Sequence, residues 1–104
     1  FYAARYGMIS LQTFFSNILI LSNKIDLELL IPKFTTNPRK ILNLPERVIK
    51  IGSPASLTIF DKNSSWDYNI ENNLSKSSNS PWLDWSLRGM VFGVVNSKKS
   101  IFNH

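Results

Sequence analysis

The residue types that most often perform catalysis are scarce in this chain of 104 residues. It has no cysteine, and its single histidine, His104, is the last residue. A catalytic zinc ion takes about three protein ligands, most often histidines, so the sequence predicts no metal site. His104 stands at a chain end, where residues are usually mobile, and we do not expect it to bind a metal. The composition therefore predicts a chain with no catalytic residue and no metal site of its own.

Two aspartates and three tryptophans have side chains that could act in a site. Asp61 and Asp67 could form an acid–base pair, but a turn aspartate and a loop aspartate are the simpler interpretation. Trp66, Trp82 and Trp85 could stack on a sugar or a nucleobase. Tryptophans beside strands more often pack between two parts of a protein, and we expect that role here.

The net charge of +5 could favour an anionic partner, but the distribution of the charges does not. No basic run is longer than the pairs Arg39-Lys40 and Lys98-Lys99, and acidic residues lie among the basic ones. Nucleic-acid-binding proteins instead gather lysine and arginine on one face. We therefore expect no nucleic acid partner.

The most apolar segment, residues 11–21, is too short and too polar to cross a membrane. A bilayer requires roughly 20 apolar residues, and this segment contains Gln12, Thr13, Ser16 and Asn17. It also lacks the basic stretch and the small-residue cleavage pattern of a signal peptide. The absence of cysteine fits a reducing compartment, so we expect a cytoplasmic protein with no membrane partner.

The hydrophobic period predicts a helix over residues 11–21. Apolar side chains recur there at the spacing of one helix face, namely Leu11, Phe14, Phe15, Ile18 and Leu19. Ile20 and Leu21 widen this stripe, which predicts a helix that is buried on more than one side.

Two shorter helices are expected next. The Asp26 carboxylate is predicted to cap a helix over residues 27–34, and Pro32 within that helix should distort it. Asn37 and Pro38 have the order of an N-cap followed by proline at the first helical position, which predicts a helix through Leu42.

From residue 48 the period changes to that of strands. Residues 48–51, 57–60 and 87–95 are rich in β-branched and aromatic side chains, and we expect a strand at each. Residues 61–63 predict a turn, and residues 63–80 predict a surface loop that is anchored by Trp66 and Tyr68. Residues 96–98 predict a turn into a last strand over residues 100–102, which would form a terminal hairpin.

Four parts of the chain have distinctive sequences. Residues 6–13 are Tyr-Gly-Met-Ile-Ser-Leu-Gln-Thr, and residues 35–42 are Thr-Thr-Asn-Pro-Arg-Lys-Ile-Leu. Residues 51–61 are Ile-Gly-Ser-Pro-Ala-Ser-Leu-Thr-Ile-Phe-Asp. Residues 76–82 are Lys-Ser-Ser-Asn-Ser-Pro-Trp, followed by Leu-Arg-Gly-Met-Val over residues 87–91. In this order they resemble the C-terminal end of the dihydroorotases, which belong to the cyclic amidohydrolase superfamily.

The resemblance implies a fold for the chain and for a larger parent protein. Such enzymes consist of a (β/α)8 barrel joined to a small composite β-sandwich. Residues 1–46 would be the C-terminal end of the barrel, with the loop after the last strand and the helices, and residues 47–104 would be sandwich strands and the terminal hairpin. We therefore expect an α+β fragment whose partner is the remainder of the same polypeptide, and the start at Phe1 rather than methionine fits this expectation.

The resemblance also implies the chemistry of the parent. Dihydroorotases reversibly hydrolyse dihydroorotate to N-carbamoyl-aspartate in pyrimidine biosynthesis, using two zinc ions that activate a hydroxide. The family's zinc ligands and its acid–base aspartate match no position here, so the 104-residue chain alone is expected to bind no zinc and to be inactive. The parent is expected to be a homodimer.

One substrate contact is expected within the chain, at Tyr6 and Gly7. By the resemblance, the backbone of this pair lines the substrate pocket and hydrogen-bonds the dihydroorotate ring. Glycine suits a backbone that approaches a ligand closely, because a Cβ would collide with the ligand. A simpler interpretation is that Gly7 only permits a turn and that Tyr6 packs beneath the following helix.

Two other functions are compatible with the sequence. The parent could be another cyclic amidohydrolase that acts on a hydantoin-like or allantoin-like ring. It could also be a non-catalytic, dihydroorotase-like scaffold subunit that binds a partner enzyme such as aspartate carbamoyltransferase. The patterns over residues 6–13 and 76–82 favour dihydroorotase over the other cyclic amidohydrolases.

Overall fold

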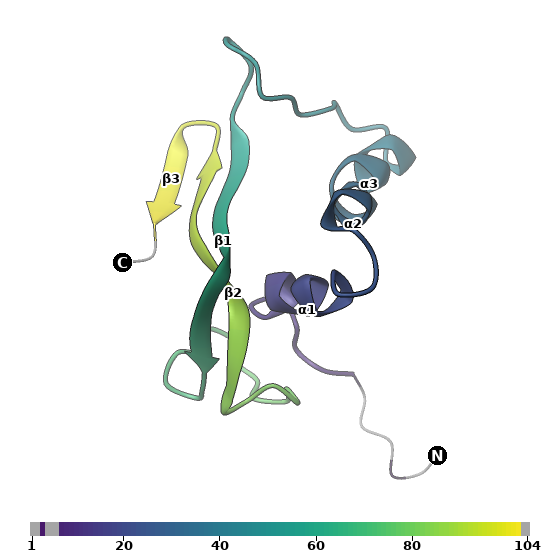
Figure 1. Cartoon of the computed structure of the whole chain (residues 1–104). Helices are drawn as coiled ribbons and strands as arrows, with labels where there is room; N and C mark the ends of the chain where they lie inside the picture. Colours follow the sequence, from purple (N-terminus) through teal and green to yellow (C-terminus); the bar gives the residue numbers. More distant parts are fainter. Residues whose placement is uncertain (1–2, 4–6, 103–104) are drawn as a thin grey trace.

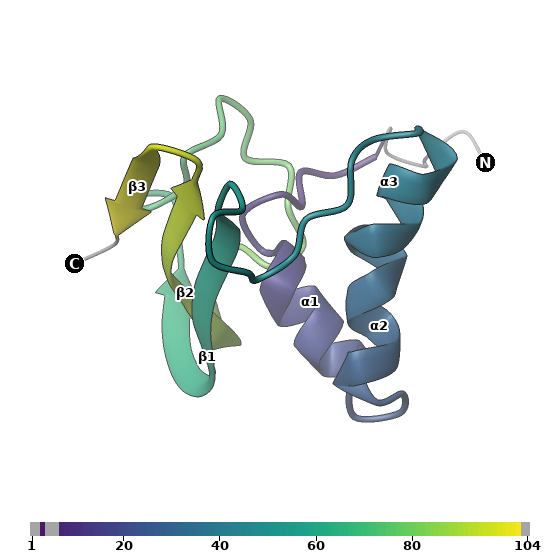
Figure 2. The same ribbon diagram turned by 90° about the horizontal axis from the view of Figure 1, so that it is seen from above.

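The computed structural model describes residue 3 and residues 7–102. Within them the elements are, in chain order, α1 (Phe14–Leu21), α2 (Leu27–Phe34), α3 (Thr36–Ile41), β1 (Ser56–Tyr68), β2 (Trp85–Asn96) and β3 (Lys99–Phe102). The helices come first and the strands second (Figure 1), so the predicted α+β class is confirmed. Figure 2 shows the layers: the sheet, then α1, then α2 with α3.

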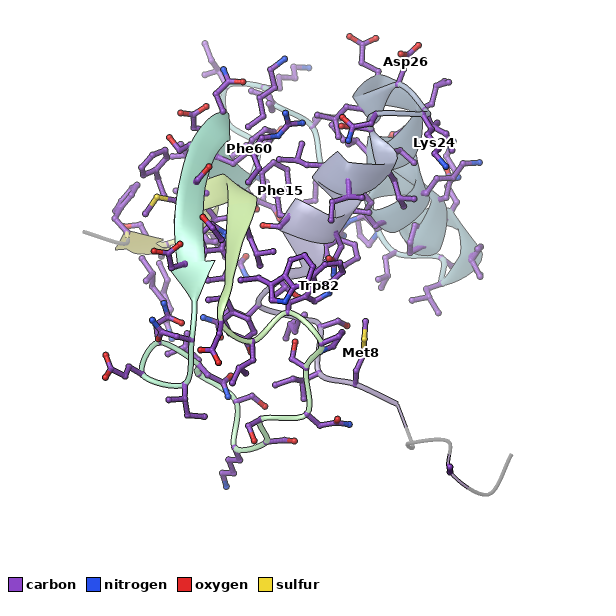
Figure 3. The ribbon with its side chains drawn as sticks, turned by 60° about the horizontal axis from the view of Figure 1, so that its bottom comes forward. Met8, Phe15, Lys24, Asp26, Phe60 and Trp82 are labelled. Atoms are coloured by element: carbon purple, nitrogen blue, oxygen red, sulfur yellow. The ribbon has the colours of Figure 1, made fainter. Side chains whose placement is uncertain are left out.

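The helix α1 packs on the sheet. It begins at Phe14, since residues 11–13 form a turn instead of the predicted first helical turn. Its buried residues are Ser16 and Leu19, and it lies against β2. Phe15 of α1 faces Phe60 of β1 (Figure 3), with ring centroids 4.4 Å apart.

The other side of α1 meets α2 through the ring of Phe14, which contacts Phe34 edge-on at 5.2 Å between centroids. The helix thus packs on two sides, as predicted, but Ile20 and Leu21 are each 48% exposed among the described residues. A sheet on one side and a short helix on the other do not cover these two positions within the described residues.

The helix α2 spans the predicted residues and includes Pro32. Asp26 lies directly before it, and its backbone carbonyl accepts hydrogen bonds from the N–H groups of Leu29 at 2.9 Å and Leu30 at 3.2 Å. The Asp26 carboxylate makes no capping hydrogen bond, so the predicted capping role of this side chain is wrong.

The helix α3 begins at Thr36, one residue before Asn37. The prediction of Asn37 as the N-cap is therefore wrong, and Pro38 is the third helical residue rather than the first. Proline is tolerated there because N–H groups in the first turn have no partner within a helix. The helix ends at Ile41, and the φ of 51° at Asn43 lets the Leu44 N–H donate a hydrogen bond of 2.8 Å to the Arg39 carbonyl in the last turn.

The strand predicted over residues 48–51 is not formed. Residues 44–50 have no regular structure and connect α3 to the sheet as an exposed segment, in which Ile49 is 90% exposed. A β-branched run becomes a strand where a neighbouring strand completes its hydrogen bonds. In the described part of the chain, the sheet consists of β1, β2 and β3 and offers this segment no such neighbour.

The three strands form an antiparallel sheet in the order β1-β2-β3. β1 and β2 pair from Ser56 with Asn96 to Tyr68 with Trp85, and residues 69–84 connect them. β3 pairs with the end of β2 across a tight turn in which Ser97 has φ 54°. This geometry confirms the predicted terminal hairpin.

β1 continues through the residues for which the sequence predicts a turn and a loop. Asp61 pairs with Met90 and Ser65 pairs with Arg88, so residues 62–64 form a bulge opposite Gly89. The turn-forming residues therefore act inside a strand. The predicted loop over residues 63–80 is confirmed from residue 69 onward.

The buried core is small for the length of the chain. Among the described residues the buried apolar side chains are Leu19, Leu30, Tyr68 and Leu87. The accessible surface is 8808 Å², whereas a compact protein of this length exposes about 6,000 Å². The radius of gyration is 15.8 Å, against about 13 Å for a compact chain of this length. The helices and the sheet therefore leave much apolar surface uncovered.

Candidate functional site

Gly7 belongs to the expected substrate contact and is described by the structure, whereas Tyr6 lies outside the described residues. Gly7 has φ 71°, a left-handed conformation that favours glycine. A Cβ added to Gly7 would meet no described atom within 4 Å. The positive φ accounts for a glycine here without a ligand, and the contact with a substrate stays a prediction.

Asn79 holds the backbone of this segment. Its side-chain Nδ2 donates a hydrogen bond of 2.6 Å to the carbonyl oxygen of Gly7. Its backbone carbonyl accepts a hydrogen bond of 3.0 Å from the N–H of Ile9. Both bonds connect residues 7–9, here called the glycine segment, to the loop between β1 and β2. One residue of the loop thus fixes two peptide groups of the glycine segment.

Gln12 connects the same two segments a few residues further on. Its Nε2 donates to the backbone carbonyl of Asn72 at 2.8 Å, and its Oε1 accepts from the N–H of Leu74 at 2.9 Å. The side-chain amide thus provides a hydrogen-bond partner for one carbonyl and one N–H group of the loop backbone. Residues 7–12 and the loop residues 72–79 are therefore joined into one assembly by the hydrogen bonds of Asn79 and Gln12.

A groove of about 440 Å³ lies beside this assembly. Its lining comes from residues 9–13, from the loop residues 73–75 and from the end of β1, namely Ile9, Ser10, Leu11, Gln12, Thr13, Tyr68, Asn73, Leu74 and Ser75. The lining contains no carboxylate, no amine and no imidazole. It can orient a ligand or a neighbouring segment, but it supplies no charged catalytic group.

The loop over residues 69–84 is ordered largely by its own asparagine side chains. Asn69 Oδ1 accepts from the N–H groups of Glu71 and Asn72, each at 3.1 Å. Asn73 Oδ1 accepts from the hydroxyl of buried Tyr68 at 3.0 Å, and its Nδ2 donates to the Ser77 carbonyl at 2.8 Å. The sequence predicts anchoring by aromatics, and Tyr68 does anchor the loop, but through Asn73.

Ser16 joins α1 to both long strands. Its buried Oγ donates to the Gly89 carbonyl at 3.3 Å and accepts from Trp66 Nε1 at 3.2 Å. The sequence marks Ser16 only as a polar residue in an apolar helix. Its partners lie fifty or more positions away, so sequence spacing does not predict this role.

The two aspartates do not form a site. The Asp61 carboxylate accepts hydrogen bonds from the Ser64 hydroxyl at 2.6 Å and from the Asn63 N–H at 2.8 Å. The hydrogen bond from Ser64, followed by those from the backbone, lowers the pKa of Asp61 below its ordinary value of 3.8. Asp61 lies on β1 and pairs with Met90, so its predicted position in a turn is wrong, and its carboxylate instead holds the backbone of the bulge. Asp67 lies on β1, so its predicted loop position is wrong.

The tryptophans make aromatic contacts within the chain. Trp82 contacts Trp85 edge-on with ring centroids 5.5 Å apart, and Trp66 lies 5.6 Å from the ring of Tyr68. Together with the bond from Trp66 to Ser16, these contacts assign them to packing around the sheet.

The described residues do not fit a metal ion. In residue 3 and residues 7–102, no three histidine, cysteine or acidic side chains gather into a cluster that could hold one. His104 lies outside the described residues. The same part of the chain contains no helix that is long and apolar enough to cross a membrane.

No protein-family model matches the chain. The matches to curated proteins define one class, the dihydroorotases. The chain is 42% identical over 98 residues to the dihydroorotase of Aquifex aeolicus (strain VF5), a match that covers 92% of this chain and 23% of that protein. It is 34% identical over 101 residues to the dihydroorotase of Geobacter metallireducens, covering 94% and 24%. The dihydroorotase of Elusimicrobium minutum is 36% identical over 91 residues, covering 85% and 21%.

These matches confirm the resemblance to the dihydroorotases that residues 6–91 predict. The chain spans about a quarter of the length of the curated relatives that it matches. That proportion is consistent with a C-terminal fragment of a dihydroorotase.

Proposed function

We propose that this chain is the C-terminal part of a dihydroorotase whose whole chain reversibly hydrolyses dihydroorotate to N-carbamoyl-aspartate in pyrimidine biosynthesis. Matches at 31–42% identity to proteins named dihydroorotase favour this reaction over that of a hydantoinase or an allantoinase. The parent is a cytoplasmic homodimer that uses zinc, and its zinc ligands lie outside the described residues of this chain.

The role of this chain in the parent is twofold. Its helices and strands are a scaffold that packs against the remainder of the polypeptide, as the end of a (β/α)8 barrel over residues 1–46 and as sandwich strands over residues 47–104. Its backbone at Tyr6 and Gly7 hydrogen-bonds the ring of dihydroorotate. Support for this second role comes from the open space beside Gly7, where an added Cβ would meet no described atom within 4 Å, while Asn79 holds the Gly7 carbonyl.

Substitution of Gly7 in the full-length protein tests the substrate contact. Gly7→Ala adds a Cβ at the point of approach, and we expect the KM for dihydroorotate to rise about threefold to tenfold, the value of one net hydrogen bond. The turnover number and the zinc content should stay within about twofold of wild type, because the zinc ligands lie elsewhere. Steady-state kinetics and metal analysis of the purified protein give all three quantities.

Gly7→Asn separates the contact from the conformation. Asparagine tolerates the left-handed backbone that alanine resists, so it restores the KM if only the turn matters. If the added side chain blocks the substrate, Gly7→Asn raises the KM as much as Gly7→Ala does. An unaltered KM in both folded variants would support the turn interpretation, and a full-length protein that does not hydrolyse dihydroorotate would contradict the proposed reaction.

A further inference from the structure

The side chain of Asn79 acts on the one peptide group of the expected substrate contact that the structure describes. The bond from its Nδ2 to the Gly7 carbonyl is 2.6 Å long, shorter than the 2.9–3.0 Å common for N–H···O hydrogen bonds. A glycine peptide without such a partner can rotate between left-handed and right-handed conformations at little cost. The Asn79 amide therefore selects one orientation of the peptide that follows Gly7.

That orientation extends to the neighbouring groups. A peptide unit is planar, so fixing the Gly7 carbonyl also fixes the direction of the Met8 N–H. The Ile9 N–H is held separately by the Asn79 backbone carbonyl. Consecutive peptide groups from Gly7 to Ile9 thus take their directions from a single residue, located 72 positions away from Gly7.

Asn79 is itself held in place by hydrogen bonds within its own loop. Its backbone N–H donates to the Ser77 hydroxyl at 3.3 Å, and the Ser80 N–H on its other side donates to the Ser78 carbonyl at 2.8 Å. Gln12 ties residues 72–74 of the same loop to the same segment. The amide is therefore preorganised by the loop, which lowers the entropy that the contact costs.

From these contacts we infer that Asn79 is a positioning residue for substrate binding: its side-chain amide orients the Gly7 peptide that contacts the dihydroorotate ring. This inference rests on the proposed function, since it assigns to Asn79 the geometry of that proposed contact. It also gives a role to residues 76–82, whose pattern resembles the dihydroorotases and which hold no catalytic group.

Asn79→Ala in the full-length protein tests the inference. The substitution removes the bond to Gly7 and keeps the backbone bond to Ile9, so the segment should stay in register. We expect the KM for dihydroorotate to rise about threefold to tenfold with the turnover number within about twofold of wild type. Asn79→Asp should raise the KM at least as much, because it keeps the shape but places a carboxylate oxygen against the Gly7 carbonyl. Ser78→Ala is the matched control, since the exposed Ser78 hydroxyl makes no hydrogen bond to the described residues, and its KM should equal that of wild type.

A double-mutant cycle separates this inference from the proposed function. If Asn79 acts through Gly7, the effects of the two substitutions are not independent. The fold-increase in KM of the Gly7→Ala/Asn79→Ala double variant is then well below the product of the fold-increases of the two single variants. If Gly7→Ala raises the KM and Asn79→Ala behaves like Ser78→Ala, Asn79 is not a positioning residue, although the substrate contact stands. A lower thermal midpoint for Asn79→Ala with an unchanged KM would also overturn the inference, because it would show a structural role alone. If neither Gly7 variant changes the KM, the proposed contact itself fails.

Discussion

Gly89 of β2 lies close against α1. An added Cβ there would lie 2.3 Å from Leu19 Cδ1 and 3.1 Å from Phe15 Cε1, and the residue has φ 94°. We expect Gly89→Ala to lower the free energy of unfolding of the full-length protein by about 2–4 kcal/mol, as overpacking and a strained φ add. Unfolding in denaturant, monitored by circular dichroism, measures this loss of free energy.

Gly52→Ala is the matched control for this prediction. Gly52 has φ 84°, and an added Cβ would meet nothing within 4 Å among the described residues. Its substitution should therefore cost the conformational strain alone, roughly 1–2 kcal/mol. Equal losses for the two variants would contradict a close approach at Gly89.

Asp61 gives the protein a dependence on acid pH. The hydrogen bond from Ser64 lowers the pKa of Asp61, so the ionised carboxylate stabilises the bulge at pH values above the ordinary pKa of 3.8. This stabilisation is lost as the pH falls below 3.8 and through the lower folded pKa. We expect Asp61→Asn to remove this part of the pH dependence, as measured by unfolding of the full-length protein across pH 2–6.

Asp67→Asn serves as the control for Asp61. Asp67 lies on the same strand, and its carboxylate makes no hydrogen bond with the described residues. The Asp67→Asn variant should therefore lose stability in acid as the wild-type protein does, because Asp61 is still present to be protonated. An Asp61→Asn protein with the wild-type profile would show that the hydrogen bonds from Ser64 and Asn63 do not favour the ionised carboxylate.

At the scale of elements, local patterns predicted those parts of the fold that depend on local contacts. The period of apolar residues predicts the three helices within a few residues of their bounds, and β2 with its terminal hairpin follows from strand propensity and turn residues. The capping roles predicted for Asp26 and Asn37 are local errors, and the larger errors lie where distant contacts decide the structure. Residues 48–51 have the composition of a strand but no neighbouring strand in the described chain. Residues 62–64 form a bulge because β2 pairs with β1 on both sides of them.

The candidate site shows the same division. A glycine at a turn is visible in the sequence, and the resemblance added a substrate role to Gly7. The contributions of Asn79 and Gln12 were not predicted, because their partners lie 72 and 60–62 positions away. A polar residue inside an apolar run, such as Gln12, was the available signal, but it identifies no partner. Only pairing of β1 with β2 places the loop against the glycine segment.

At the scale of the whole molecule, much apolar surface of the described chain is exposed to solvent. Large apolar side chains such as Leu11, Leu74 and Ile51 are almost fully exposed. Asn17 Oδ1 and Trp82 Nε1 are buried without a hydrogen-bond partner among the described residues. Buried polar atoms normally have partners, so these two atoms are exceptions. The exposed apolar side chains are the surface that the remainder of the polypeptide would cover.

We therefore expect the isolated 104-residue chain not to fold on its own. Ordering each residue costs about 1–2 kcal/mol in backbone entropy. The four apolar side chains that are buried among the described residues form too small a core to offset that cost. Differential scanning calorimetry and an amide NMR spectrum of the isolated monomer check this expectation. A cooperative thermal transition with dispersed amide signals would contradict it, whereas the same segment within the full-length protein should be protected from hydrogen exchange.

The bonds from Asn79 and Gln12 also set an order of events during translation. Asn79 leaves the ribosome about 4–14 s after Gly7, at a synthesis rate of about 5–20 residues per second, since 72 positions separate them. Until then the glycine segment has neither of the bonds that fix its peptide groups, and the loop that supplies them closes only when β1 and β2 have paired. The segment with the proposed substrate contact is thus translated before the rest of the described chain and is among the last parts to become ordered.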